Sequence, residues 1–378
     1  MFKKKWKNKA LILLLIAFFS FSVAGCGVPE PAPENNNDVA VADPDEVYHW
    51  TLQGFTPEGT LFQDWTHDWA NLVETLSHGR IQIDVHPPGS IVPSLEGIYA
   101  VRDGVLDVHL GYSGMWIGHD IAAPLFCSVP GMIGPLDMAQ WLYQGGGIEL
   151  YQELMDEVNA KVIPAGIIGT EIFLWADEPL KSIDDYRGKT LRMMPLMGEI
   201  IQEFGREYGI AVEFLPAAEV IPALERGVVD AAEYSIPAFD ETLGFHDVAN
   251  YFHYPGIHQP TGVLEVLISQ DRWDELPEDL QEIVHIASET NMLRTWMEGE
   301  RMNIETLRRF EEAGVQKVIL DEETVEIFMD WSDQWFEAAS QEHEFLGRVR
   351  QSQVEFVKEW YTYRDNTELP FPDWSLQE

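Results

Sequence analysis

Cysteine and basic side chains are scarce in this sequence. Cys26 and Cys127 are the only cysteines among 378 residues, so a disulfide framework is excluded and no Cys-x-x-Cys pair supports a zinc or iron–sulfur site. The 24 lysines and arginines stand against 64 aspartates and glutamates, which gives a formal net charge of −40. Because such a polyanion repels phosphate backbones, we expect no nucleic-acid partner.

Common enzyme motifs are also absent. The sequence has no Gly-x-Ser-x-Gly elbow, no His-Glu-x-x-His, no phosphate-binding loop and no Gly-x-Gly-x-x-Gly. The nearest approach to a histidine cluster is His246, His253 and His258, in an aromatic segment where packing or hydrogen bonding is the expected role. No cysteine or carboxylate beside them completes a zinc tetrahedron, and we expect no catalytic activity.

Long apolar runs are missing after residue 19, so no later segment is expected to cross a bilayer. Residues 1–25 have the three parts of a secretory signal: a basic start, an apolar centre and an end of small residues. The junction Val23-Ala24-Gly25-Cys26 resembles a bacterial lipobox, in which the cysteine is acylated. We therefore expect a signal peptide over 1–25, a lipid anchor at Cys26 and an extracytoplasmic location. Residues 26–46 are rich in proline, asparagine and acids, which is typical of a flexible tether.

Short strand-like and longer helix-like patterns alternate from residue 47 onward. Residues 47–53 and 80–86 alternate in the manner of strands, and apolar residues recur at helical spacing over 60–77 between them. Strand, helix and strand in this order imply crossover connections onto a largely parallel sheet. Helix formers dominate from 280 to 362. The sequence therefore predicts an α/β protein whose long C-terminal helices clasp another lobe or a second subunit.

A weak internal repeat divides the α/β region. Residues 92–96 return as 221–225, and Gly104-Val105-Leu106-Asp107 returns as Gly227-Val228-Val229-Asp230. In both places a helix is expected to end at a glycine and a buried strand to begin beside an aspartate. We interpret the repeat as two similarly built lobes facing each other across a ligand cleft. The predicted domain boundaries are 47–168 plus about 263–290 for lobe I, and 169–262 plus about 291–378 for lobe II.

A few polar residues mark the expected cleft. Arg192 lies within an apolar strand, and its guanidinium fork matches a carboxylate with two hydrogen bonds. Glu171 precedes one predicted strand and Glu233 follows another, so two carboxylates could hold a cation or the ammonium group of a ligand. Aromatic residues that could line the cleft are Trp116, Trp175, Tyr234, Phe239, Tyr251, Phe252 and Tyr254.

Three stretches resemble the solute-binding proteins of TRAP transporters. They are residues 78–107, which begin with His78-Gly79-Arg80-Ile81, residues 183–193 and residues 222–234. The resemblance extends over about 47–360. It implies a bilobed, periplasmic-binding-protein (Venus-flytrap) receptor with two mixed or parallel sheets, which is no enzyme and hands its ligand to a separate, cation-driven membrane permease.

Residues 233–240 and 251–256 are similar to the branch of that family that binds 2-oxo or 2-hydroxy monocarboxylates, such as pyruvate or lactate, together with a metal ion. The resemblance puts Arg192 at the carboxylate-binding arginine, and Glu233 and the main chain of Tyr234 among the metal ligands. Glu171 replaces the glutamine of the family, and its added charge favours calcium over sodium. The resulting candidate ligand contacts are Arg192, Tyr234, Glu171, Tyr112, Trp116 and Phe239, and the candidate metal ligands are Glu171, Glu233 and Tyr234.

Two other functions remain open on the sequence alone. An amino-acid receptor would use Glu171 and Glu233 to hold an ammonium group in place of a metal. A surface-anchored hydrolase would use the same acidic pair for catalysis. The sequence also leaves open a homodimer formed through the C-terminal helices.

Overall fold

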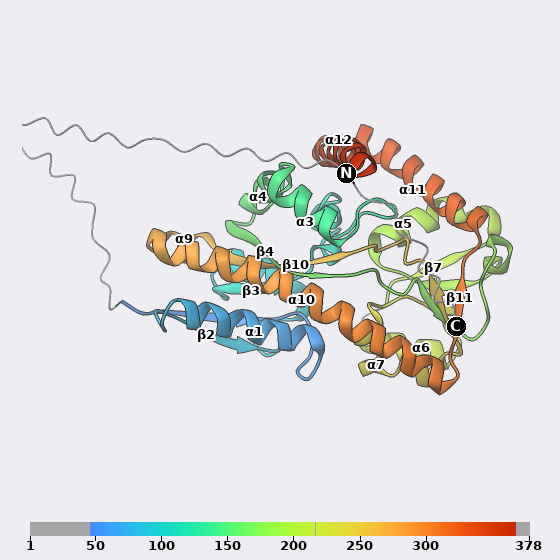
Figure 1. Cartoon of the computed structure of the whole chain (residues 1–378), viewed down its shortest axis with the longest axis horizontal. Coiled ribbons are helices and arrows are strands. Elements are labelled where there is room, and N and C mark those ends of the chain that lie inside the picture. Colours follow the sequence, from blue (N-terminus) through green and yellow to red (C-terminus); the bar gives the residue numbers. More distant parts are fainter. Residues whose placement is uncertain (1–45, 216, 368–378) are drawn as a thin grey trace, which may run out of the picture. The chain divides into compact units, whose positions relative to one another are not determined.

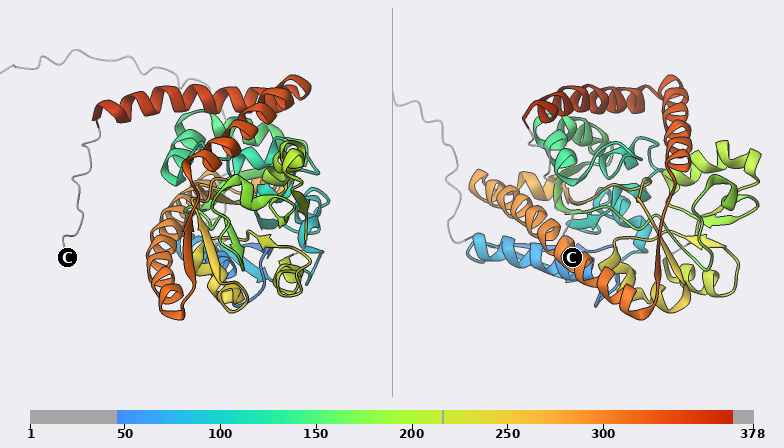
Figure 2. Two further views of the ribbon diagram at one scale, coloured as in Figure 1. Left: turned by 90° about the vertical axis from the view of Figure 1, so that its right-hand side faces the viewer. Right: turned by 45° about the vertical axis from the view of Figure 1, so that its right-hand side comes forward.

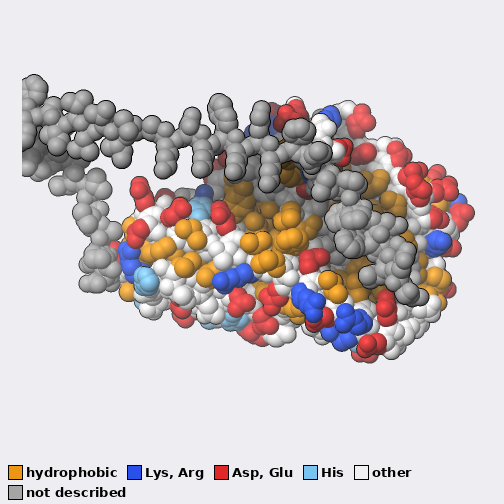
Figure 3. All heavy atoms as spheres, viewed as in Figure 1, with side chains coloured by type: hydrophobic (Ala, Val, Ile, Leu, Met, Phe, Trp, Pro, Cys, Tyr) orange, Lys and Arg blue, Asp and Glu red, His pale blue; other side chains and the backbone are white. Residues whose placement is uncertain are grey.

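The computed structural model describes residues 46–215 and 217–367. The predicted signal peptide 1–25, the predicted lipid anchor at Cys26 and nearly all of the predicted tether lie outside the described residues. Within the described ranges, no helix has the combination of length and apolar character needed to cross a membrane. Acidic side chains outnumber basic ones over much of the face in Figure 3, as the net charge requires.

The first of two sheets has the strand order β2-β1-β3-β10-β4. Its strands are β1 (Tyr48–Gln53), β2 (Ile81–His86), β3 (Val108–Gly111), β4 (Ala160–Ile168) and β10 (Gly262–Ser269). Strand β1 runs parallel to β2 and β3 because helices α1 (Leu61–Leu76) and α2 (Gly97–Arg102) provide the crossovers, as predicted. Strand β10 returns from far along the chain and pairs antiparallel with both β3 and β4, so this sheet is mixed.

The second sheet has the order β11-β9-β5-β8-β6-β7. Its strands are β5 (Leu174–Ala176), β6 (Thr190–Arg192), β7 (Ala211–Glu213), β8 (Ala231–Ala232), β9 (Tyr251–Tyr254) and β11 (Gln316–Ile319). Strand β11 interrupts the segment in which helix formers dominate, and β8 is shorter than its apolar sequence suggested. The predicted α/β architecture with two mixed sheets is confirmed.

Three long helices follow β10 and connect the two sheets. Helix α10 (Glu278–Ala313) contacts α1 and β4 on one side and α7 (Pro237–Leu243) and β11 on the other. Figure 1 shows it in orange, running from the first sheet to the second. Helix α11 (Glu322–Glu342) packs on α5 (Pro195–Phe204), and α12 (Glu344–Thr367) returns to α4 (Gly147–Asp156) (Figure 2). The C-terminal helices therefore hold elements beside both sheets, as predicted.

Four further α-helices complete the described part of the chain. They are α3 (Pro135–Gln144), α6 (Ala217–Glu225), α8 (Phe245–Val248) and α9 (Gln270–Asp274). The predicted lobe boundary at 168/169 falls at the end of β4, and the one at 262/263 falls at the start of β10. The boundary expected near 290 lies inside the continuous helix α10. The lobe boundaries remain a prediction.

The internal repeat corresponds to the same local structure in both halves. Gly104 and Gly227 have φ values of +70° and +66°, the left-handed conformation that ends a helix. The carboxylate of Asp107 then accepts a hydrogen bond of 2.7 Å from the backbone N–H of Thr51, at the neighbouring strand β1. Asp230 accepts one of 2.7 Å from the N–H of Thr190 at the start of β6. The repeated aspartate thus fixes two adjacent strands in each half.

Glu265 is a buried acid in the middle of β10. Its backbone is paired with Gly111 of β3 and Pro164 of β4, its side chain is fully buried, and neither carboxylate oxygen has a hydrogen-bond partner within the described part of the chain. Burial raises the pKa of this carboxyl well above its usual value. The native state therefore favours the protonated form of Glu265.

We expect this group to make the free energy of unfolding fall as pH rises. An acid whose pKa is higher in the folded state stabilises fully below its unfolded pKa, near 4.3, and loses that contribution above it. The loss approaches about 1.4 kcal/mol per pH unit. Chemical denaturation of Glu265→Gln between pH 4 and 8 should give a shallower decline. The exposed Glu149→Gln serves as the control, and equal slopes in all three proteins would contradict the assignment.

Candidate functional site

Strand pairing in the second sheet brings Arg192 and Glu233 together. Strand β6 runs parallel to β8 with Arg192 opposite Ala232, so the next residue, Glu233, emerges directly beside the arginine. The N–H of Glu233 donates to the carbonyl oxygen of Arg192 at 3.1 Å. The arginine, which lies within an apolar strand as predicted, points into the protein and is 2% exposed.

Arg192 and Glu233 form a buried ion pair. The Nη1 group of Arg192 donates to Glu233 Oε1 and also to the Glu233 carbonyl oxygen at 2.8 Å. The Nε–H of Arg192 is buried and has no partner among the described residues. One donor of the guanidinium therefore remains available for another acceptor.

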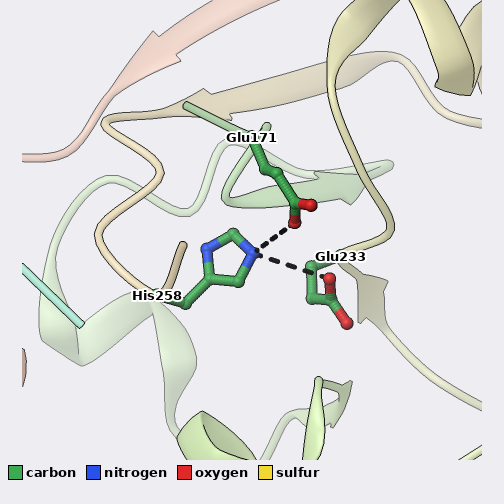
Figure 4. A group of neighbouring side chains, drawn as sticks. All are labelled: Glu171, Glu233 and His258. Carbon is green, nitrogen blue, oxygen red and sulfur yellow. Dashed lines mark ion pairs between the residues drawn. The ribbon is translucent and has the colours of Figure 1, made fainter. Parts of the chain in front are cut away.

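A third buried residue, His258, lies against both glutamates. Its Nε2 atom is 3.3 Å from Glu171 Oε2 and 3.5 Å from Glu233 Oε2, and Figure 4 shows the ring directed between the two carboxylates. One ligand atom from each of the three side chains lies within 4.8 Å of the others. We call Glu171, Glu233 and His258 the acidic cluster.

The backbone at Gly256 explains how His258 reaches this place. A Cβ atom at Gly256 would lie 2.0 Å from the Glu171 carbonyl oxygen, so only glycine allows this approach. On the other side of His258, the carbonyl oxygen of the next residue, Gln259, accepts a hydrogen bond of 3.1 Å from the Glu171 N–H. The segment carrying His258 is thus fixed against the strand that follows Glu171.

His258 was not among the site residues predicted from the sequence, because neither Glu171 nor Glu233 lies near it along the chain. His246 and His253 do not join it. His253 Nδ1 lies 2.8 Å from the Leu174 carbonyl oxygen, and its Nε2 accepts from the Leu180 N–H at 2.9 Å. The only local signal for His258 was the Pro-Gly pair that precedes it, which marks a tight approach of the backbone.

The buried groups shift one another's protonation. Burial raises the pKa of Glu171 to about 7, although His258 opposes this rise. Burial also disfavours the charge on Glu233, but the Arg192 guanidinium and His258 hold its pKa below the usual value. Burial lowers the pKa of His258, but hydrogen bonds to Glu171 and Glu233 outweigh it and raise the pKa to about 9. A proton on His258 therefore offsets the negative charge of the two glutamates.

The aromatic candidates divide between this site and the core. The Arg192 Cζ atom lies 5.5 Å from the ring centre of Tyr234, which stacks on Phe239 at 5.8 Å. Tyr112 accepts a hydrogen bond from the side chain of Gln259 and so touches the same region. Trp116 packs instead on the ring of His109 at 6.4 Å.

The other aromatic candidates belong to the second sheet. Trp175 donates from Nε1 to Asp240 at 2.7 Å and packs on Phe252 at 5.9 Å. Tyr251, Phe252 and Tyr254 are residues of β9. Structural packing, rather than ligand contact, accounts for the positions of Trp175 and Phe252.

A small cavity of about 20 Å³ borders the acidic cluster through His258. Its walls come from segments next to both sheets: Gly114, Pro124, Cys127, Ser128, Met194, Leu196, Met197, His258 and Gln259. The Ser128 Oγ and Gln259 Oε1 atoms are buried without a hydrogen-bond partner in the described ranges. A mainly apolar space with a few unpaired polar atoms is typical of a small-ligand site.

The donor set fits a metal ion. Glu171 Oε2 and Glu233 Oε2 are buried, and both face His258 Nε2, at 3.3 Å and 3.5 Å. Two buried carboxylates this close together need a positive charge beside them, which a protonated His258 or a bound cation supplies.

Two mixed sheets, with a buried polar site and a small pocket between their elements, define a bilobed solute-binding protein. Residues 53–342 match the profile of the family described as bacterial extracellular solute-binding protein, family 7 (DctP), and the chain belongs to this family. It is a receptor of the TRAP-transporter class and not an enzyme.

One curated relative is a monocarboxylate 2-oxoacid-binding periplasmic protein of Nostoc sp. (strain PCC 7120), which is 29% identical over 81% of this chain and 83% of its own length. Similar solved structures include TRAP solute-binding proteins from Bordetella bronchiseptica, with calcium and picolinate, and from Colwellia psychrerythraea, with calcium and pyruvate. The first has a TM-score of 0.80 and 22% identity, and the alignment covers 85% of this chain and 95% of that chain. The second has a TM-score of 0.80 and 23% identity over 85% and 98%.

The close approach at Gly256 gives a test of the site's construction. We expect Gly256→Ala to lower the free energy of unfolding by about 1–3 kcal/mol, because the added methyl group forces the backbone of Glu171 to move. The control is Gly118→Ala, since nothing lies within 4 Å of a Cβ at Gly118. Urea denaturation measures both variants. Equal stability of the two would show that the approach is not tight.

Proposed function

We propose that this receptor captures a small 2-oxo or 2-hydroxy monocarboxylate, of the pyruvate or lactate class, together with a divalent metal ion, and delivers it to a TRAP membrane permease. The observation that carries the proposal is the unpaired, buried Nε–H of Arg192 beside two buried carboxylates that converge on His258 Nε2. One part of the site attracts an anion and the adjoining part attracts a cation. A metal-bound carboxylate satisfies both.

Arg192 is the proposed contact for the ligand carboxylate. Its guanidinium already pairs with Glu233 through Nη1, so the ligand would take the remaining donors of the fork. Tyr234 and Phe239 would line the site beside the arginine. Tyr112 would hold the side chain of Gln259 in place by accepting its hydrogen bond. The contact proposed from the sequence for Trp116 has the least support, since its ring packs on His109.

Glu171, Glu233 and the main chain of Tyr234 are the proposed metal ligands. The two glutamates and a ligand carboxylate bring three negative charges, against one positive charge on Arg192. When the cation displaces the proton of His258, a divalent ion leaves the buried site neutral, whereas sodium leaves it one negative charge in excess. This balance favours calcium over sodium. The metal would supply a positive charge that binds the carboxylate and the 2-oxo or 2-hydroxy oxygen of the ligand.

The comparisons support the same ligand class. The Nostoc relative is named for 2-oxoacids, and a structure from Pseudoalteromonas atlantica with a TM-score of 0.79 contains sodium and pyruvate. An ammonium group held by the two glutamates is the less favoured alternative, because the Nostoc relative is named for 2-oxoacids and two of the similar structures contain calcium with picolinate or pyruvate.

Closure of the two lobes would complete binding. Exclusion of water strengthens each contact between buried charges, so a ligand with these charges shifts the population toward the closed state. Attachment through an acylated Cys26 would keep the receptor near its permease, and the lobe boundaries given above would set the moving parts. A homodimer through the C-terminal helices remains a prediction.

Removal of the arginine tests the carboxylate contact. We expect Arg192→Ala to weaken pyruvate binding by about 2–5 kcal/mol, because the ligand carboxylate would then be buried without its partner. Isothermal titration calorimetry at fixed calcium concentration measures this change.

The matched control for that experiment is Arg301→Ala. Arg301 is an exposed residue of α10 that pairs with Glu305 on the same helix. A thermal melt of Arg192→Ala shows whether the fold persists without the ion pair. Unchanged pyruvate affinity in a folded Arg192→Ala protein would refute the carboxylate contact.

Chelation tests the metal. We expect pyruvate affinity to fall after treatment with a chelator and to return with calcium more fully than with sodium. Glu171→Gln should lower calcium affinity about tenfold or more, because it removes one charge from the ligand set. Calorimetry with pyruvate and with alanine compares the two ligand classes. A pyruvate affinity that is unaffected by chelation, or an affinity for alanine higher than that for pyruvate, would contradict the metal assignment.

A further inference from the structure

His258 occupies a position that the proposed metal site does not yet explain. Its side chain is completely buried, its Nδ1 atom has no hydrogen-bond partner within the described residues, and its Nε2 atom faces only the Glu171 and Glu233 carboxylates, at 3.3 Å and 3.5 Å. Two other buried histidines behave differently. His253 satisfies both of its nitrogens on backbone groups, and His109 Nδ1 lies 2.8 Å from the Gln53 carbonyl oxygen. A histidine retained only for packing would resemble these two.

We propose that His258 Nε2 is a third protein ligand of the metal, and that it shifts the selectivity of the site from calcium toward a divalent ion that accepts nitrogen, such as manganese, cobalt or zinc. This inference rests on the proposed function for the location of the metal at Glu171 and Glu233. It concerns which divalent ion the chain selects.

The distances are compatible with one coordination shell. A metal with ligands at about 2.1 Å has neighbouring ligand atoms about 3.0 Å apart in an octahedron and about 3.4 Å apart in a tetrahedron. His258 Nε2 lies 3.3 Å and 3.5 Å from the two Oε2 atoms. Small adjustments of the side chains would therefore place all three atoms around one ion.

The nature of the donors decides between metals that the distances alone admit. Calcium takes oxygen ligands almost exclusively, and its ligand shell has six to eight members. Imidazole suits zinc, iron, copper and nickel, and carboxylates suit manganese. Two carboxylates and one imidazole form a mixed set that calcium uses poorly. Three protein ligands also leave open positions for the carboxylate and 2-oxo oxygens of a ligand.

The surroundings hold the imidazole in this orientation. The ring of Phe173 lies 5.6 Å from the ring of His258, and the approach of Gly256 to the Glu171 backbone fixes the segment that carries the histidine. Figure 4 shows that Nε2 points between the carboxylates, while the other nitrogen points away from them. The ring is positioned for ligation before any ion arrives.

The test compares metals in the full chain after removal of metal with a chelator. Equilibrium dialysis measures the affinities of manganese, cobalt, zinc and calcium, each alone, for the unchanged protein and for His258→Gln. We expect His258→Gln to weaken manganese, cobalt and zinc by at least about tenfold while calcium changes by less than about threefold. The control is His343→Gln, since His343 is exposed at the end of α11. Equal losses for all four metals, or no loss, would overturn the inference.

A second measurement does not depend on the folding of a variant. Pulsed electron paramagnetic resonance of the manganese-loaded, unchanged protein detects nitrogen coupling from a directly bound imidazole. The expected spectrum contains that coupling, and a spectrum with oxygen ligands alone would overturn the inference.

Calorimetry with pyruvate separates failure of this inference from failure of the proposed function. Pyruvate binding that needs calcium and is indifferent to His258 would leave the proposed function intact and refute the role of the histidine. Binding of pyruvate with no metal at all, with a protonated His258 in its place, would refute both.

Discussion

The arrangement of the site depends on the buried ion pair between Arg192 and Glu233, which lies where strands β6 and β8 of the second sheet end. Taking two charges out of water costs several kcal/mol for each, and the pair repays this only when hydrogen bonds satisfy the remaining atoms. Glu233 has one oxygen on the arginine and the other 3.5 Å from His258 Nε2, and Arg192 keeps an unused N–H. The pair is therefore incompletely compensated, which is unfavourable for a purely structural role and useful for a site that receives charged ligands.

Glu171 and His258 add further buried charge beside the ion pair. Glu171 adds a second acid from another strand end, and His258 lies where both acids can contact it. Attraction for a cation and attraction for an anion thus arise only a few atoms apart. This proximity favours ligands in which a metal and a carboxylate bind as a unit, and it disfavours a lone anion, which the glutamates would repel.

Local sequence patterns predicted those parts of the fold that depend on neighbours in the chain. The crossovers of the first sheet, the buried position of Arg192 and the repeated glycine and aspartate turns follow from periodicity and from residue type. The antiparallel strand β10 and the strand β11 depend on pairing with distant segments, and no local pattern specifies a partner.

The same limit applies to the site. Glu171 and Glu233 were identifiable as strand-end acids, whereas His258 is 87 positions from the first and enters through a loop whose path is set by Gly256. The conformation of that loop depends on contact with the Glu171 backbone, which is a tertiary interaction. Residue type alone could not distinguish this histidine from His253, which packs into the core nearby.

Helix α10 has a mechanical consequence for a protein of this class. It is one uninterrupted helix of 36 residues that touches elements of both sheets, and Gly299 in its interior packs against Trp65 and lies near Ile236. A change in the angle between the two halves would therefore bend α10. Helices resist sharp bends but tolerate gentle curvature. The helix would bend elastically when the two halves open, and its return to a straighter form would favour the closed arrangement.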